Sequence, residues 1–270
     1  MSQDITRRRV VYEMPNENSV IVRSDIEFAG AAGQPLVFDL FRPGRSATRP
    51  PAVILVAGFP DAGTQKMLGC RFKEMQFTVS WAKLIAASGL AAVAATNHEP
   101  AGDLAALIQH ALTNADALGI SDSGVGVMAT SGHGALGLST LMKSGPPVAC
   151  GAFLYPYTMD LDGATGVAEM SKRFGFVDAC AGRTLDDLCT DVPMLFARAG
   201  QDAFPHLNTS LDRLVAQGLT RNLPLTIVNY PAGVHAFDLM DPSEGSRAII
   251  RSVLTFLTSH LGRAENEPAP

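Results

Sequence analysis

The chain is predicted to be a single α/β domain over residues 1–270, in which a mostly parallel sheet carries helices on both faces. From residue 52 onward, short apolar runs alternate with stretches of helical periodicity, as in parallel strands joined by crossover helices. Upstream, residues 8–42 alternate in a two-residue rhythm, which is typical of antiparallel strands. A length of 270 residues with 47% hydrophobic side chains suits one large domain.

The predicted elements follow from these patterns in chain order. Alternating apolar residues, such as Leu36, Phe38 and Leu40, mark antiparallel strands at one edge of the sheet. Strands are then expected at 52–57, 91–96, 124–129, 149–156, 193–199 and 224–230. Helices are expected at 78–89, 103–118, 131–144, 205–218 and 243–261. The helix at 103–118 has the clearest pattern, because its Leu and Ala side chains recur at helical spacing and Asp103 can cap its start.

Two stretches interrupt the alternation. Residues 157–191 mix aromatic side chains with Gly and Asp, and we expect a short lid there, with Phe174 beside a pocket; a plain surface excursion is the alternative. Residues 61–77 form the other irregular stretch, where Phe72 is expected to line the same pocket. The last residues, 263–270, are expected to be a flexible tail.

One serine stands where a predicted strand turns into a predicted helix. The apolar run over 125–128 leads into a turn around Ser131. Such a turn exposes a hydroxyl above the sheet beside helix N–H groups, as a serine nucleophile requires. Small residues must flank it, and Ala129 meets that need, whereas His133 stands where Gly is usual, with Gly134 directly after it. An ordinary Ser-Gly loop is the alternative unless a base and an acid follow.

Both an acid and a base follow the serine along the chain. His235 lies on a loop containing Gly and Pro after the apolar run 225–230, where an imidazole can reach the serine; a solvated surface histidine is the alternative. Asp202 stands just past the strand at 193–199 and can orient the imidazole. It could also cap the helix that follows. Other available acids are Asp160, Asp162 and Asp238.

Backbone donors for a developing negative charge are expected on two turns. The strand at 52–57 ends in Gly58, Phe59 and Pro60. The N–H of Phe59 and the N–H of Gly132, the residue after the serine, form the best pair for an oxyanion. Pro60 has no N–H and can only shape the turn. An ordinary strand-to-helix turn is the alternative.

With its parts in the order oxyanion loop, Ser131, Asp202 and His235, the chain resembles the α/β-hydrolase fold. Within that group it is similar to the dienelactone-hydrolase-like esterases, over roughly residues 35–262. The segments that carry the resemblance are 57–60, 129–134, 199–202 and 233–237. Dienelactone hydrolases proper use a cysteine nucleophile where this chain has a serine, and His133 is a second departure.

The resemblance implies hydrolysis of a carboxylic ester, lactone or thioester of a small molecule through an acyl-enzyme. No cofactor or metal is implied. The residues expected to shape the substrate pocket are Gly58, His133, Phe72, Phe174 and Phe237. For His133 three roles remain open: a bulky residue tolerated on the first helical turn, a residue that trims the pocket, or a second titrating group near the serine.

Composition argues against several other classes of protein. The net charge is −5, and the only basic cluster, at residues 7–9, lacks interleaved aromatic residues, so nucleic-acid binding is not expected. The four cysteines have no metal-ligand spacing, and no phosphate-binding glycine loop is found. The N-terminus lacks the apolar core of a signal peptide, and the apolar stretch 84–95 is too short to span a membrane. We expect a cytoplasmic protein, and a homodimer is compatible with the sequence.

A non-catalytic protein of the same fold, binding a ligand or a partner, is the main alternative. Its support is the unusual His133. The joint presence of Ser131, Asp202 and His235 favours an enzyme, since a binding protein has no need for all three. Ester, thioester, lactone and peptide bonds are not separated by the sequence, because their hydrolysis shares the acyl-enzyme route.

Overall fold

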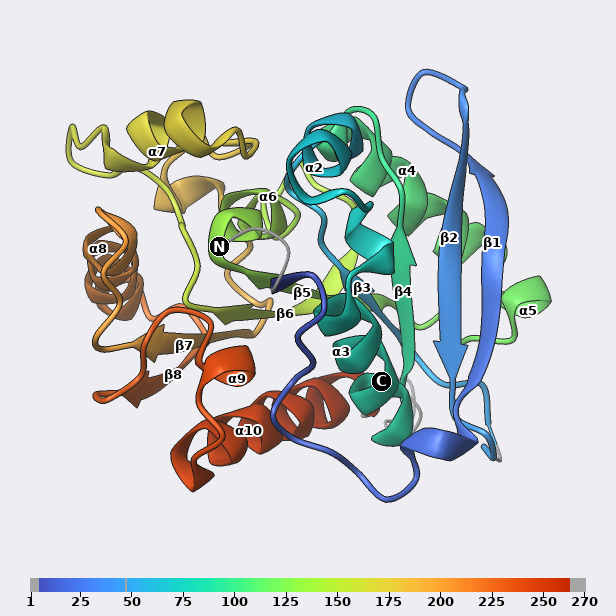
Figure 1. Ribbon diagram of the computed structural model, residues 1–270. Helices are drawn as coiled ribbons and strands as arrows, with labels where there is room; N and C mark the ends of the chain where they lie inside the picture. The colour runs from blue at the N-terminus through green and yellow to red at the C-terminus, as the bar shows by residue number, and fades with distance from the viewer. Residues whose placement is uncertain (1–4, 47, 263–270) are drawn as a thin grey trace, which may run out of the picture.

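An eight-stranded, mostly parallel sheet forms the centre of the computed structural model, which describes residues 5–46 and 48–262 (Figure 1). The order of its strands is β1-β2-β4-β3-β5-β6-β7-β8. Only the pairs β1–β2 and β2–β4 are antiparallel. The strands are β1 (Ile21–Ala29), β2 (Pro35–Arg42), β3 (Ala52–Leu55), β4 (Ala91–Ala95), β5 (Val125–Thr130), β6 (Val148–Leu154), β7 (Met194–Ala199) and β8 (Leu225–Tyr230). The predicted fold class is thereby confirmed; the expected tail at 263–270 lies outside the described residues.

Helices cover both faces of this sheet. On one face, α3 and α10 pack on the inner strands (Figure 1), and the other face is covered by α4, α6 and α8. Every residue of β3 and β4 is buried, as expected for strands covered on both sides. The helices are α2 (Asp61–Leu68), α3 (Gln76–Ala87), α4 (Pro100–Thr113), α5 (Ala115–Leu118), α6 (Gly134–Ser139), α7 (Gly166–Phe174), α8 (Leu207–Thr220), α9 (Phe237–Met240) and α10 (Glu244–Leu261).

The helix predicted at 131–144 is much shorter in the structure. Residues Ser131–His133 form a 3₁₀ turn and α6 ends at Ser139. The Ser139 and Thr140 hydroxyls donate to carbonyls three residues back, at Leu136 and Gly137, and so compete with continued helix. The chain then turns away, and Met142 pairs with Leu188 in an isolated antiparallel bridge.

Two other predicted elements also differ. The stretch 61–77, expected to be irregular, contains α2 and a 3₁₀ turn at Phe72–Glu74. The helix expected at 103–118 starts earlier and divides into α4 and α5 at Asn114, whose side chain donates to the carbonyl of His110. The Asn114 side chain thus marks the end of α4, whereas α2 ends before Gly69, which has a left-handed φ of +81°.

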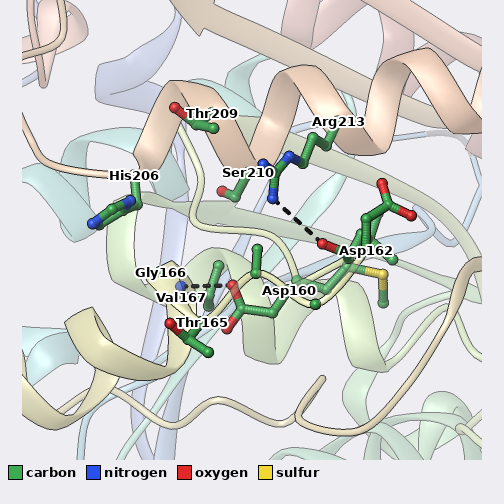
Figure 2. A pocket seen from close by; sticks show the side chains of 13 residues that line it. Asp160, Asp162, Thr165, Gly166, Val167, His206, Thr209, Ser210 and Arg213 are labelled. Atoms are coloured by element: carbon green, nitrogen blue, oxygen red, sulfur yellow. Dashed lines mark hydrogen bonds between the residues drawn. The ribbon is translucent and has the colours of Figure 1, made fainter.

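The segment 157–191 lies beside α8 and carries α7 (Figure 1). A cavity of about 300 Å³ lies between this segment and α8, and Figure 2 shows the side chains that line it. Its polar groups bond to one another: the Asp160 carboxylate accepts the N–H of Val167, and Arg213 donates to the carbonyl of Leu161. The first bond lies within the segment, and the second joins the segment to α8.

Candidate active site

Ser131 lies in a tight turn at the carboxyl end of β5. Its φ is +51°, a left-handed conformation that is strained for a residue with a side chain. Its carbonyl accepts the N–H of Tyr157 at 3.0 Å, which ties the turn to the segment after β6. Gly134, three residues on, leaves no room for a side chain, since a Cβ there would lie 2.4 Å from the carbonyl oxygen of Tyr157. The absence of a side chain at Gly134 thus allows the segment after β6 to pack closely against the serine turn.

The structure brings together the three polar residues singled out by the sequence. Ser131 Oγ lies 2.9 Å from Nε2 of His235, and Nδ1 of His235 lies 2.6 Å from Oδ2 of Asp202. They follow β5, β8 and β7, respectively, and the carboxyl ends of these parallel strands lie at one edge of the sheet. The Asp202 side chain is fully buried, whereas that of His235 is 20% exposed. This chain of contacts can transfer a proton from the hydroxyl to the imidazole.

Asp202 also organises its own loop. Its second carboxylate oxygen, Oδ1, accepts the N–H of Phe204 at 2.9 Å. It does not cap the following helix, because the residue before α8 is His206. The turn brings the Phe204 ring to 4.3 Å from the ring of His235, between centroids. The Asp202 carboxylate therefore contacts the imidazole of His235 and also positions the Phe204 ring beside it.

The other three acids have different partners. Asp160 accepts backbone N–H groups at the start of α7, and Asp162 accepts the amide of Gln217. Asp238 is 1% exposed and accepts from Trp81 Nε1 at 2.7 Å and from the Tyr155 hydroxyl at 2.6 Å. None of them hydrogen-bonds to His235 in the described part of the chain.

Tyr155 is a site residue that the sequence analysis missed. It follows β6 directly, has a φ of +37°, and lies with its ring centroid 4.8 Å from that of His235. Burial is the largest cause of its raised pKa, and burial also raises the pKa of its partner Asp238. The sequence feature that could have identified Tyr155 is its position at the carboxyl end of a central strand, next to the strand that leads to Ser131.

The turn after β3 carries Gly58 and Phe59 to the serine. Asn97 Nδ2 donates to the carbonyl of Phe59 at 3.2 Å, and the carboxylate of Asp61 accepts the N–H of Asn97. Within the described residues, neither the N–H of Phe59 nor that of Gly132 has a hydrogen-bond acceptor. Neither donor is therefore bonded within the part of the protein that the structure describes.

His133 faces this turn. Its Nδ1 accepts the N–H of Gly58 at 2.7 Å, so the ring carries its proton on Nε2. Burial lowers the pKa of His133 to about 4. The imidazole is consequently neutral at neutral pH. This argues against the third role considered for His133, that of a second titrating group near the serine.

An apolar cavity of about 180 Å³ opens beside Ser131. Phe72 and His133 line it, as expected from the sequence. Ile5, Met67, Leu68 and Leu239 line it as well, and no motif marked them. The complete lining is Ile5, Phe59, Thr64, Met67, Leu68, Phe72, Met75, Phe77, Thr130, Ser131, His133, Tyr155, His235, Ala236 and Leu239.

The other expected pocket residues lie elsewhere. Phe237 is fully buried and packs against Tyr155 and Tyr230 in the core, so the prediction that it lines the pocket is wrong. The chain enters α9 here, which turns Phe237 inward and leaves its neighbour Ala236 at the cavity wall. Phe174 does not line the cavity either, but packs against Phe204. Gly58 lies behind His133.

Neither a metal site nor a membrane span is found in the described residues. No three His, Cys, Asp or Glu side chains are grouped there in a way that could hold a metal ion. None of the helices described is long and apolar enough to cross a membrane.

The chain has the α/β-hydrolase fold, and several solved structures that superpose on it are esterases at 15–19% identity. No protein-family model matches the sequence, and no curated protein matches it significantly. A bacterial heroin esterase superposes with a TM-score of 0.68 at 15% identity, over 93% of this chain and 87% of that one. An esterase from the archaeon Pyrobaculum calidifontis gives 0.67 at 19% identity, over 88% and 85%. Esterase LipW from Mycobacterium marinum gives 0.68 at 16% identity, over 92% and 83%.

Proposed function

We propose that the chain is a serine hydrolase that cleaves a carboxylic ester of a small molecule, of the dienelactone-hydrolase-like kind. The observation that carries the proposal is the line of contacts from Ser131 through His235 to Asp202, at 2.9 and 2.6 Å. The likeness to esterases of the same fold supports it. Lactones and thioesters would follow the same route.

In the proposed mechanism, His235 Nε2 takes the proton of Ser131 as Oγ attacks the ester carbonyl. Asp202 holds the imidazole by Nδ1–H and stabilises its charged form. The N–H groups of Phe59 and Gly132 stabilise the oxyanion of the tetrahedral intermediate. His235 then protonates the leaving alcohol, and a water activated by the same imidazole cleaves the acyl-enzyme. The scheme needs no cofactor.

The cavity indicates the class of substrate. Its volume of about 180 Å³ suits a short acyl or alkyl group, and aromatic, Met and Leu side chains make up most of its wall. Among the described residues, no Lys or Arg lines it, so a neutral, apolar group is favoured over an anionic one. The segment 157–191 would act as a short cap beside this entrance, since its Phe174 packs on Phe204 and Phe204 packs on His235.

The test is covalent labelling of the folded chain with a fluorophosphonate, followed by peptide mass spectrometry. This probe requires an activated serine but no knowledge of the natural substrate. We expect one adduct, on Ser131, and its loss in His235→Ala. Hydrolysis of p-nitrophenyl acetate and p-nitrophenyl butyrate should fall by at least about 10³-fold in Ser131→Ala.

Two results would contradict the proposal. The first is folded protein without an adduct on Ser131, which would favour a binding protein of the same fold. The second is a Ser131→Ala variant that keeps more than a tenth of wild-type turnover. A circular dichroism spectrum and a melting curve of each variant establish that the chain is folded.

A further inference from the structure

Gly58 joins the two peptide groups that lead to Phe59, and both are hydrogen-bonded from outside the turn. Its N–H donates to Nδ1 of His133 at 2.7 Å. Its carbonyl accepts the N–H of Val177 at 2.8 Å. Glycine has the freest backbone of all residues, so these two bonds restrict the two peptide groups on either side of Gly58.

The second of these bonds bears directly on Phe59. The carbonyl of Gly58 and the N–H of Phe59 belong to one planar trans peptide and point in opposite directions. Holding the oxygen with Val177 therefore aims the Phe59 N–H the other way. The peptide can still rotate about the Gly58 Cα unless the preceding N–H is also held, and His133 holds it.

The surroundings of His133 suit an acceptor rather than a general base. Its ring packs between Phe59, at 5.1 Å between centroids, and Phe72, at 4.9 Å. These contacts fix the ring plane. Since the pKa of this imidazole is lowered to about 4, Nδ1 keeps its lone pair for the Gly58 N–H at neutral pH.

We propose that His133 is a positioning residue that fixes the oxyanion loop through the Gly58 N–H, so that the Phe59 and Gly132 donors converge on one oxygen. This inference rests on the proposed serine-hydrolase function. His133 directly follows Gly132 and contacts the residue directly before Phe59. One side chain thus sets the spacing between the two donors.

The loop has little freedom to compensate for loss of this contact by moving closer. A Cβ added at Gly58 would lie 2.8 Å from Cα of His133 and 3.2 Å from the carbonyl oxygen of Gly132. The backbones therefore already touch. Loss of the acceptor instead leaves the buried Gly58 N–H without a partner, and the peptide is expected to rotate toward water.

Two variants of nearly equal size separate the acceptor from the bulk of the side chain. In His133→Asn, the amide oxygen can occupy the position of Nδ1 and accept from Gly58. In His133→Leu, the volume is kept and the acceptor is lost. His98→Leu, at an exposed histidine that does not line the cavity, is the control.

The kinetic readouts are kcat and KM for p-nitrophenyl butyrate and the inhibition constant of a trifluoromethyl ketone, which forms an oxyanion on the serine. In His133→Leu, we expect kcat to fall about 10- to 100-fold with KM within a factor of about three. Inhibition by the ketone should weaken by the same factor as kcat/KM. His133→Asn should recover most of the loss. If His133 had a merely structural role, kcat would not fall separately from KM, and the activity would not depend on whether residue 133 carries a hydrogen-bond acceptor.

A readout independent of turnover is the hydrogen exchange of the Gly58 amide, followed by NMR. Exchange should be slow in the wild type and in His133→Asn, and fast in His133→Leu. Unchanged kcat in a folded His133→Leu variant, or equal protection in all three chains, would overturn this inference alone. A wild-type chain that hydrolyses no ester and takes no fluorophosphonate would overturn the proposed function, and the positioning role with it.

Discussion

The packing of Gly134 against the segment after β6 gives a sharp prediction. A Cβ at Gly134 would lie 2.4 Å from the Cβ of Pro156 and 2.4 Å from the carbonyl oxygen of Tyr157. The second of these atoms belongs to the backbone and cannot rotate away. Gly134→Ala therefore forces α6 and the strand end apart.

The size of the effect follows from these distances. An ordinary contact begins at about 3.4 Å, so the backbones must separate by about 1 Å. Overpacking of this kind costs about 1–3 kcal/mol of stability, from which the better helix propensity of Ala returns about 0.5–1 kcal/mol. The elbow moves too, because the Ser131 carbonyl is bonded to the Tyr157 N–H in the same contact. A displacement of that order can reduce turnover about 100-fold.

The assay is urea unfolding followed by circular dichroism, together with ester hydrolysis. The matched control is Gly63→Ala in α2, where no atom lies within 4 Å of the added Cβ. This control should gain about 0.5–1 kcal/mol and keep its activity. If Gly134→Ala were as stable and as active as the wild type, the steric account of the elbow would be refuted.

Two further predictions concern parts of the chain outside the site. Lys73 is 4% exposed and bonds to Asp39 at 2.7 Å and to Asp25 at 2.9 Å. The free energy of unfolding of Lys73→Met, measured in urea at pH 7, should therefore be about 3–5 kcal/mol lower than that of the wild type. Lys66→Met, at an exposed position, is the control and should not show this loss. The hydrogen bond from Lys73 lowers the pKa of Asp25, so this difference should shrink as the pH falls below about 4 and the carboxyl is protonated; a pH-independent difference would contradict the assignment. Cys150 and Cys180 are buried, and burial raises the pKa of Cys150 to about 12 and also raises the pKa of Cys180. Iodoacetamide should therefore label Cys70 and Cys189 first. Early labelling of Cys150 or Cys180 would contradict the packing.

The strands were predictable because burial on both faces produces nearly continuous apolar runs. β4 is Ala-Ala-Val-Ala-Ala, and no residue of it is exposed. The three polar residues at the strand ends could be found for a related reason. Ser131 directly follows β5, and Asp202 and His235 lie on the loops after β7 and β8, where the carboxyl ends of parallel strands share one edge.

The cavity wall was less predictable. Phe237 looked like a pocket residue because it follows His235 closely, but one helical turn rotates it into the core. Met67 and Leu68 belong to α2, a short helix with Gly63 inside it and no clear apolar stripe. The side chains face the cavity rather than the core, so hydrophobic periodicity carried no signal for them. Ile5 reaches the cavity from the far N-terminal segment, which no local pattern reveals.

The unusual residue at the elbow has a steric explanation that involves a second glycine. A serine turn of this kind needs space two residues after the nucleophile, and Gly usually provides it at that position. In this chain Gly58 provides the space instead, since a side chain there would meet the Cα of His133 at 2.8 Å. The two positions are therefore coupled: His133 fits because residue 58 has no side chain, and Gly58 is held because residue 133 has an acceptor. The double variant Gly58→His/His133→Gly should therefore lose ester hydrolysis. It places the bulky side chain on the oxyanion loop and removes the hydrogen bond that orients this loop.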